Sequence, residues 1–402
     1  MKLPLIFYYH RLNTYSFNAL AGAIDAHPSI SDLSIDIALT EEQLRTLTAV
    51  NLNRYGRTLV CLSVMTCQFA SIQRIVRVLQ SDFGSHITIV AGGPHVTACP
   101  DDVLGIGVDI AFRGEAEVGF PETIQTLTEG QKVHNIQSPM KPVDIDAFHS
   151  FSPRRGMFGP IEITRGCAFA CRYCQTSLIF GAGLRHRSID NIVRQAKNLP
   201  STNRTVVRLL SPNAFSYGSE DGLQLNLTAI RELLAAIRKT VTAKGKIIFA
   251  HFPSEARPEH ITPDTIDLLK EFADNDEIVI GAQSGSNRML EVCNRSHTVE
   301  DVLNAVSMLR RSGYKVIVDF IFGLPEESEE DIRETLAVIE DLVRMGARIH
   351  PHIFSPLPQT AFSKERPGII SPLVKEALKQ FQSRRGLYEN SRAQKLEDFG
   401  LK

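Results

Sequence analysis

Three closely spaced cysteines constrain this chain more than any other feature of its sequence. They lie in the run Gly166-Cys167-Ala-Phe-Ala-Cys171-Arg-Tyr-Cys174, just after the β-branched run Ile161–Thr164. A strand that opens into a short loop brings three thiolates together without long-range folding. Three thiolates fill three corners of a [4Fe–4S] cube and leave one iron open to a small molecule, whereas a structural zinc site normally recruits a fourth protein ligand. A zinc site with a distant fourth ligand, or a set of buried thiols, is the alternative.

The spacing C-x3-C-x2-C, with the aromatic residue Tyr173 before the last cysteine, resembles the signature of the radical S-adenosylmethionine (SAM) superfamily. The resemblance implies that Cys167, Cys171 and Cys174 hold the cluster and serve catalysis, and that SAM chelates the open iron through its amino and carboxylate groups. It also implies that one electron from the cluster cleaves SAM to a 5′-deoxyadenosyl radical, which abstracts hydrogen from a substrate. A reductant such as flavodoxin or ferredoxin would supply the electron.

Length and composition limit the classes of protein to which the chain can belong. Its 402 residues predict about two to three domains. A formal net charge of −1 gives no electrostatic footprint for nucleic acid, so we expect no nucleic-acid partner. No apolar run approaches the roughly 20 residues of a membrane span, so we expect no membrane partner. Seven clustered cysteines favour a reducing, cytoplasmic location over a disulfide framework.

Residues 3–130 alternate short apolar runs with helical patterns. Apolar strands separated by helices predict a parallel sheet with helices on both faces, that is, a doubly wound, Rossmann-like α/β domain over residues 1–130. Such sheets bind ligands at the carboxyl ends of their strands. The candidate binding residues at those ends are Ser63, Thr66, Gly92, Gly93, Pro94, Gly114 and Glu115.

This N-terminal part resembles the cobalamin-binding domain that precedes the cluster domain in one large radical SAM class. The matching pieces are the turn Gly92–His95, Thr97 and Pro100 beyond it, and the run Arg113–Glu117. The resemblance implies that the strand-end residues named above bind cobalamin. Glycines at a strand end let the backbone approach a flat macrocycle or a nucleotide tail closely. The alternative is a Rossmann-like module that only docks against the catalytic barrel.

One motif of other cobalamin proteins is missing. The D-x-H-x-x-G motif supplies a lower cobalt ligand, but Asp25-Ala-His27 is followed by Ile30 where glycine is needed. His10 ends the first predicted strand, near the place of such a ligand, yet its surroundings do not match. We therefore expect that no protein histidine holds the lower face of a bound cobalamin.

Residues 131–158 lack a periodic apolar pattern and include several prolines, which is typical of a linker between domains. From Ile161 onward, six βα-like units predict a partial (β/α)6 TIM-like barrel over residues 159–365. Residues 366–402 begin with an amphipathic pattern and are interpreted as a C-terminal helical extension. In barrels the chemistry lies at the carboxyl ends of the strands.

Several of these strand ends match strings that the radical SAM family uses for SAM. The run Ser254–Arg257 matches a serine or acidic residue and an arginine, although helix capping and surface charge would also explain it. The run Gly281–Ser286 is similar to G-x-Q-S-G-s. The run Asp319–Glu326 is similar to D-f-I-x-G-l-P-g, with Glu326 in place of the usual glycine. The resemblance implies that SAM contacts Tyr173, Ser254, Glu255, Arg257, Gln283, Ser284, Arg295 and Gly323.

Two histidines alternate on the last predicted strand of the barrel. His350 and His352 precede a run that resembles the terminal P-x-P-G-T string of the family, with Gln359 where glycine is expected. Residues two apart on a strand share a face. The pair could line the substrate cavity, act as acid and base, or be structural, and the sequence does not separate these roles.

We therefore expect a cobalamin-dependent radical SAM enzyme, with a [4Fe–4S] cluster, SAM and cobalamin as cofactors. Methyl transfer is the leading reaction, because unactivated carbon has no electron pair for ordinary transfer from SAM and the cofactors carry such chemistry. The substrate, a small molecule or a peptide, is not identified. One alternative is a radical rearrangement, cyclisation or oxidation without cobalamin. Another is an iron–sulfur binding protein without turnover.

Methylthiolation of RNA or protein is a third alternative. It needs a second three-cysteine cluster upstream and usually a C-terminal RNA-binding module, for which the tail is too short. Cys61, Cys67 and Cys99 have dissimilar spacing. They are interpreted as small apolar core residues.

Overall fold

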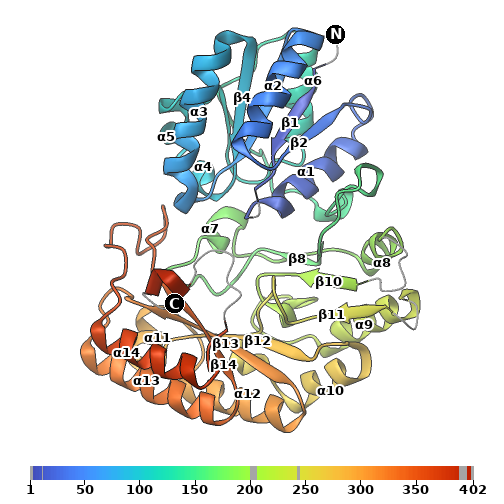
Figure 1. The fold of residues 1–402 in the computed structure, drawn as a ribbon. Coiled ribbons are helices and arrows are strands. Elements are labelled where there is room, and N and C mark those ends of the chain that lie inside the picture. The colour runs from blue at the N-terminus through green and yellow to red at the C-terminus, as the bar shows by residue number, and fades with distance from the viewer. Residues whose placement is uncertain (1–2, 11, 200–205, 242–244, 389–395, 400–402) are drawn as a thin grey trace. The chain divides into compact units, whose positions relative to one another are not determined.

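The computed structural model of the chain (Figure 1) describes residues 3–10, 12–199, 206–241, 245–388 and 396–399. The chain folds as two compact units, Met1–Gly159 and Pro160–Lys402. Within the described ranges, no helix is both long enough and apolar enough to cross a membrane.

A parallel sheet of six strands forms the centre of the first unit, in the order β2-β1-β3-β4-β5-β6. Every residue of β3 is buried, which explains why this strand reads as a continuous apolar run rather than an alternating one. The strands are β1 (Leu5–Tyr8), β2 (Ile35–Ala38), β3 (Thr58–Ser63), β4 (Ile87–Gly92), β5 (Ile110–Phe112) and β6 (Ile136–Gln137). The helices are α1 (Thr14–Ala26), α2 (Glu41–Tyr55), α3 (Phe69–Phe83), α4 (Pro94–Ala98), α5 (Pro100–Gly105) and α6 (Gly119–Thr128).

Helices cover both faces of this sheet. Successive residues of a strand point to opposite faces, so Ile6 and Phe7 of β1 enter two different hydrophobic clusters. Ile6 packs in the cluster that also takes side chains from α2, α3, α4 and α5. Phe7 packs with Phe17 of α1, at 4.5 Å between ring centroids, and with Phe120 of α6. The predicted doubly wound α/β domain is confirmed.

The segment 131–158, predicted as a linker, folds with the first unit. The guanidinium group of Arg155 bonds the carboxylate of Asp25 at 2.7 Å and the carbonyl of Leu33 at 2.7 Å. Phe151 is fully buried. Too few apolar side chains of this segment are buried to give a periodic pattern, which is why the sequence resembles a linker.

Two three-stranded parallel sheets form the second unit, in the orders β11-β10-β7 and β12-β13-β14. A parallel bridge between Ala256, after β11, and Ile280 of β12 connects them. Six parallel strands thus follow one another in chain order, and the predicted partial barrel is confirmed. They are β7 (Ile161–Glu162), β10 (Val206–Leu210), β11 (Lys246–Ile248), β12 (Glu277–Gln283), β13 (Lys315–Phe322) and β14 (Arg348–Ile353), and a short antiparallel pair adds β8 (Thr164–Arg165) and β9 (Arg185–His186).

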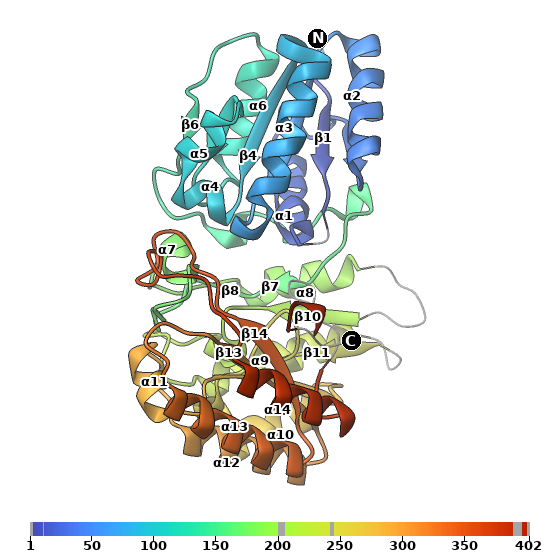
Figure 2. The same cartoon turned by 60° about the vertical axis from the view of Figure 1, so that its left-hand side comes forward.

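The longer helices of this unit lie along one side of the strands in both views (Figures 1 and 2). Side-chain caps fix where they begin: the hydroxyl groups of Thr262, Thr298 and Ser328 each accept a hydrogen bond from a backbone N–H of the first turn. The helices are α7 (Thr176–Phe180), α8 (Ile189–Lys197), α9 (Leu227–Thr240), α10 (Pro263–Phe272), α11 (Asn287–Val292), α12 (Val299–Arg311), α13 (Glu329–Arg344) and α14 (Pro372–Ser383). The last of these, α14, is the predicted C-terminal helix. It packs on α13.

Candidate functional site

The cysteine loop follows β8 and opens onto a cavity of about 410 Å³ in the second unit. Cys167, Cys171 and Cys174 all line this cavity, and none of them forms a disulfide. Gly166 begins the loop with a φ of +95°, and a Cβ atom there would lie 2.3 Å from the carbonyl oxygen of Gly183. Only glycine fits such a position, so the loop requires a glycine immediately before Cys167.

The protein surroundings by themselves do not favour thiolates at this loop. Burial raises the pKa of the Cys167 and Cys174 thiols, although hydrogen bonds from the protein partly oppose the rise. One such contact is from the backbone N–H of Thr176 to Cys174 Sγ, at 3.5 Å. Cysteine binds metal as the thiolate, so a bound metal centre would have to supply the missing positive charge. Three free thiols around one cavity, one buried and two partly buried, therefore fit the expected [4Fe–4S] cluster.

Arg257 lines the same cavity with part of its guanidinium group free. The residue is 5% exposed, and its Cζ lies 3.5 Å from the ring centroid of Phe169 in the cysteine loop. Its Nε donates to Glu259 at 2.5 Å, but its Nη2 has no hydrogen-bond partner in the described part of the chain. A buried guanidinium nitrogen without a partner is suited to binding a carboxylate. This observation fits the expected SAM site.

Arg295 reaches the cysteines from the loop after α11. Its Nη2 donates to the carbonyl oxygen of Gly281 at 2.6 Å, and its Nη1 lies 3.6 Å from Cys171 Sγ and 3.2 Å from the hydroxyl oxygen of Tyr173. The remaining nitrogen, Nε, has no partner. Arg295 thus places a second positive charge beside the cluster cysteines.

Glu255 and Gln283 form a polar pair in the cavity wall. Gln283 ends β12 with a φ of +72°, and its Nε2 donates to Glu255 Oε2 at 3.4 Å. Burial, together with the nearby carboxylate of Asp319, raises the pKa of Glu255 to about 8. Gly281 leaves the necessary space, because a Cβ atom there would lie 2.5 Å from Glu255 Oε2. At neutral pH the Glu255 carboxyl group therefore keeps its proton.

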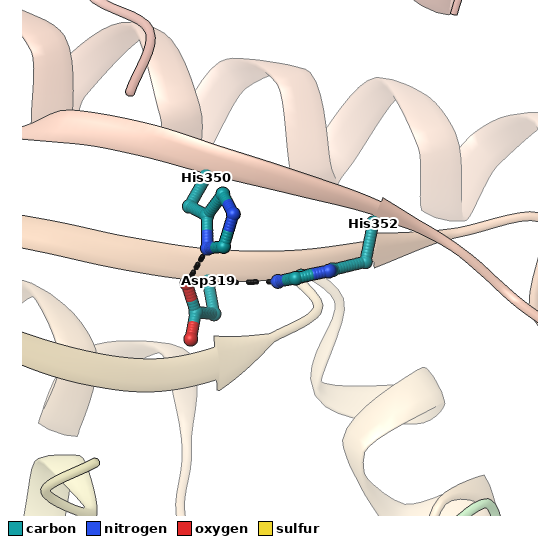
Figure 3. A group of neighbouring side chains, drawn as sticks. All are labelled: Asp319, His350 and His352. Carbon is teal, nitrogen blue, oxygen red and sulfur yellow. Dashed lines mark hydrogen bonds and ion pairs between the residues drawn. The ribbon is translucent and has the colours of Figure 1, made fainter. Parts of the chain in front are cut away.

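The last two strands bring a carboxylate and two imidazoles together (Figure 3). Asp319 of β13 pairs in register with His350 of β14, and Asp319 Oδ1 lies 2.7 Å from His350 Nδ1 and 3.7 Å from His352 Nε2. Burial alone would raise the pKa of Asp319, but the hydrogen bonds to the two histidines outweigh it and lower that pKa. Asp319 and His352 line the cavity. The sequence offered the alternating histidines as a signal and Asp319 only as the first residue of a family string, since only the strand register places it opposite them.

Three residues expected to contact SAM are not among the residues that line the cavity, and they take part in backbone contacts. Ser254 Oγ accepts from the backbone N–H of Ser211 at 2.9 Å. Ser284 Oγ accepts from the backbone N–H of Ser286 at 3.2 Å. Gly323 has a φ of +73°, and a Cβ atom there would lie 2.6 Å from the Cα of Gly368. The expected SAM residues that do line the cavity are Tyr173, Glu255, Arg257, Gln283 and Arg295.

In the first unit, candidate cobalamin residues gather at the carboxyl edge of the sheet. Gly92 at the end of β4 pairs with Ser63 at the end of β3. Gly93 has a φ of +103°, and a Cβ atom there would lie 2.8 Å from the backbone nitrogen of Val64. Pro94 then begins α4, and Ser63 Oγ is buried without a partner. A free hydroxyl beside a tight glycine turn fits a polar group of a ligand at this edge.

The other candidates of this edge contact protein groups. Thr66 Oγ1 lies 3.3 Å from His95 Nδ1. Gly114 turns the chain after β5 with a φ of +67°. Glu115 is buried and accepts from the backbone N–H of Val143 at 2.8 Å, so this carboxylate fastens the segment 131–158 to the sheet.

The upstream cysteines and His10 lie apart from any three-ligand group in the described part of the chain. Cys61 is buried in β3, as predicted for a core residue, but Cys67 is exposed and the core prediction is wrong there, because it lies in a 3-10 turn after the strand. Cys99 is partly exposed. His10 Nδ1 lies 3.0 Å from the side-chain nitrogen of Gln68.

Two family models match the chain. The model described as the radical SAM superfamily matches residues 161–339, from β7 through the cysteine loop to α13. The model described as the B12 binding domain matches residues 12–124 and covers most of the first unit.

The curated relatives have low sequence identity to this chain, and only a part of each relative is matched. The chain is 24% identical to an uncharacterized protein of Methanopyrus kandleri, over 69% of this chain and 62% of that protein. It is 21% identical to an uncharacterized methyltransferase of Pyrococcus horikoshii, over 77% and 70% respectively. It is 32% identical to a tRNA-2-methylthio-N(6)-dimethylallyladenosine synthase of Moorella thermoacetica, over 46% and 40%. The chain thus spans less than two thirds of the first of these proteins.

Two solved structures share the fold. The radical S-adenosylmethionine methyltransferase TsrM from Kitasatospora setae, with cobalamin and a [4Fe–4S] cluster bound, aligns with a TM-score of 0.66 at 15% identity, over 91% of this chain and 78% of that one. The cobalamin-dependent S-adenosylmethionine radical enzyme OxsB, with aqua-cobalamin and S-adenosylmethionine bound, aligns with a TM-score of 0.63 at 16% identity, over 99% and 58%. At such identities the likeness concerns the fold alone.

Proposed function

Because the chain belongs to the radical SAM superfamily and carries an N-terminal B12-binding domain, we propose that it is a cobalamin-dependent radical SAM methyltransferase. The radical SAM domain implies a [4Fe–4S] cluster and SAM, and the B12-binding domain implies cobalamin. The observation that carries the proposal is the cavity in which three free cysteines meet two arginines with unpartnered nitrogens. Methyl transfer is supported by the Pyrococcus relative and by TsrM, both of which are called methyltransferases.

Different residues of the cavity would bind the cluster and SAM. Cys167, Cys171 and Cys174 would hold the cluster, and the free nitrogens of Arg257 and Arg295 would bind the carboxylate of SAM. When bound, the cluster and SAM supply a radical that removes hydrogen from the substrate, and cobalamin supplies the methyl group.

Two further side chains shape the environment of this site. The ring of Phe169, itself buried, stacks on the guanidinium group of Arg257. Glu255, protonated at neutral pH, adds no negative charge beside the bound carboxylate. The substrate is a small molecule or a peptide, and a flavodoxin or ferredoxin is the proposed electron donor.

Methylthio transfer, the activity named for the Moorella relative, is not extended to this chain. That chemistry would need a second cluster upstream. Cys61, Cys67 and Cys99 lie in different places, in β3, in a 3-10 turn and between α4 and α5, and they differ in burial.

Anaerobic reconstitution with iron, sulfide and hydroxocobalamin, followed by desalting and metal analysis, tests the proposal. We expect about four iron atoms and one cobalt atom per chain. Incubation with methyl-labelled SAM, a reductant and candidate substrates should then give 5′-deoxyadenosine together with labelled product. The variant Cys171→Ala should lose iron, whereas the matched variant Cys99→Ser, outside the loop, should retain it. Four iron atoms without cobalt would favour a cobalamin-free radical reaction. Deoxyadenosine without label transfer would favour a radical reaction other than methyl transfer.

A further inference from the structure

The proposed function leaves one polar cluster of the barrel unused. Asp319, His350 and His352, called here the Asp-His-His cluster, lie on the neighbouring strands β13 and β14 (Figure 3). We propose that this cluster binds a divalent first-row transition metal ion, such as Zn²⁺, separately from the iron–sulfur cluster. The proposal does not depend on whether the enzyme transfers a methyl group.

The strand geometry sets three ligand atoms around one point. His350 and His352 are two residues apart on β14 and share a face, and the register sets Asp319 of β13 directly opposite His350. One ligand atom from each residue lies within 4.8 Å of the other two. Both rings point toward the Asp319 carboxylate from the neighbouring strand (Figure 3).

The observed separations suit a shared ion. Metal–nitrogen and metal–oxygen bonds of about 2.0–2.1 Å set neighbouring ligand atoms roughly 2.8–3.4 Å apart in octahedral or tetrahedral geometry. The Asp319 oxygen lies 2.7 Å from one histidine nitrogen and 3.7 Å from the other. These two values bracket that range, so small side-chain rotations would complete the site.

The buried carboxylate of the Asp-His-His cluster also favours a bound cation. Asp319 is 1% exposed, and among the described residues no N–H or O–H group stands in hydrogen-bond geometry to its Oδ2. No lysine or arginine of these residues forms an ion pair with it, and Glu255, whose pKa the Asp319 carboxylate helps to raise, is another carboxyl group. A buried carboxylate without a compensating charge is costly, and a divalent ion held by two imidazoles would supply that charge.

The surroundings of His350 are compatible with a metal bound at Nδ1. In that form the ring proton is on Nε2, which has no hydrogen-bond partner in the structure. The ring of His350 lies at 80° to the ring of Phe252 and at 81° to the ring of Tyr388, each 5.4 Å away between centroids. In such edge-to-face arrangements a ring N–H can point at an aromatic face.

The bound ion would face the cavity. Asp319 and His352 line the cavity that also holds the three cysteines, whereas His350 lies behind them. Three protein ligands leave at least one coordination position open, as in catalytic rather than structural zinc sites. The open position would take an oxygen or nitrogen atom of the substrate, which points to a substrate with a carboxylate, hydroxyl or amine group near its reacting carbon.

The test uses the full chain with its iron–sulfur cluster reconstituted, so that the loop cysteines are occupied. The protein is treated with a chelator, dialysed against Zn²⁺ and analysed for zinc and iron. We expect about one zinc atom per chain, with at least about tenfold weaker binding in His352→Ala and Asp319→Asn and unchanged iron. His251→Ala is the matched control, because His251 pairs with the carboxylate of Glu277 outside the cluster and lines no part of the cavity.

Zinc X-ray absorption of the unsubstituted protein keeps the test decisive if a variant fails to fold. A shell of nitrogen and oxygen at about 2.0–2.1 Å with two imidazoles would support the site, whereas sulfur at about 2.3 Å would place the zinc on cysteines and overturn it. Absence of bound zinc, or zinc retained in both cluster variants, would also overturn the proposal. Loss of iron with zinc retained would count against the proposed radical function and not against the zinc site.

Discussion

Arg257 and Arg295 each bring to one cavity a guanidinium group that the protein leaves incompletely bonded. Leaving a buried N–H unpaired costs about 1–3 kcal/mol, so a protein tolerates it where a ligand completes the bonding. The two residues come from different strand–helix units. Their convergence is the strongest residue-level sign of a small anionic ligand.

Arg257→Met tests this reading. Since a hydrogen bond to a charged group contributes about 1.5–3 kcal/mol, we expect SAM binding to weaken roughly 10- to 100-fold. Equilibrium dialysis of labelled SAM against the reconstituted protein measures it. The control is Arg231→Met, which removes an exposed arginine paired with Glu271. Equal SAM affinity of Arg257→Met and the unsubstituted protein would remove Arg257 from the site.

His297 makes the stability of the fold depend on pH. It is 3% exposed, its Nε2 lies 3.1 Å from the carbonyl oxygen of Ala282, and burial, together with Arg295 and Arg257, lowers its pKa to about 2. Below pH 6.5 the unfolded chain gains a proton on this histidine that the folded chain does not. The folded state therefore loses stability as the pH falls.

The measurement compares the unsubstituted protein with His297→Gln, which cannot titrate there. As the pH falls from 6.5 to 5, the unsubstituted protein should lose up to about 1.4 kcal/mol per pH unit relative to the variant. Urea unfolding of both proteins at several pH values gives this difference. If the two proteins differ in their free energy of unfolding by the same amount at every pH, His297 is not buried in its neutral form.

At the scale of elements, the turn between β4 and α4 is the most constrained part of the first unit. Gly93 combines a φ of +103° with backbone atoms of Val64 at 2.8 Å and 2.9 Å from the position of a Cβ atom. The turn therefore requires glycine at position 93, and it lies at the carboxyl edge of the sheet. The glycine pair in the sequence predicted this feature because no other residue type serves there.

Gly93→Ala should therefore reduce both stability and cobalamin retention. We expect a loss of about 1–3 kcal/mol, typical of a strained backbone position, and less cobalt per chain after desalting. Gly130→Ala is the matched control, because its φ of +79° is also left-handed but no atom lies within 4 Å of its Cβ position. If both variants retain the same cobalt, the turn after β4 does not contact cobalamin.

The pairing of β13 with β14 is the element-level feature that creates the Asp-His-His cluster. The alternating histidines predict only that two rings share a face. The opposing carboxylate depends on the parallel register of Asp319 with His350, and a shift by one residue would turn it to the other face. Local pattern carries no information on that register.

At the scale of the molecule, the chain divides at Gly159 and Pro160, whereas the sequence predicts a first domain of residues 1–130 and a linker of residues 131–158. The difference arises from long-range contacts. Gly22 of α1 leaves room for the carbonyl oxygen of His149, which would lie 2.6 Å from a Cβ atom there. We propose that residues 1–159 are the folding unit.

Truncation distinguishes the two boundaries. A fragment of residues 1–130 lacks Phe151, Val143 and Ile145, all buried in the structure. Because burial of one large apolar side chain contributes about 1.5–3 kcal/mol, the shorter fragment should be less stable than residues 1–159 by on the order of 3 kcal/mol or more. Urea unfolding of both fragments measures this, and equal midpoints would restore 131–158 as a linker.

The sequence by itself determined the features that depend on neighbouring residues. The cysteine loop spans only eight residues, from Cys167 to Cys174, and the alternation of apolar strands and helices gave two parallel α/β units. Such features follow from spacing and periodicity, which short-range sterics and burial fix. The family strings added candidate SAM-binding residues at the positions where the sequence matches them.

Only the tertiary structure establishes which side chains lie close together. It brought Arg257 and Arg295 to the cysteines, turned Ser254 and Ser284 to backbone contacts, and set Asp319 against two histidines. These outcomes depend on strand register and on packing between segments distant in the chain. No local periodicity encodes such pairings, so only the folded molecule establishes them.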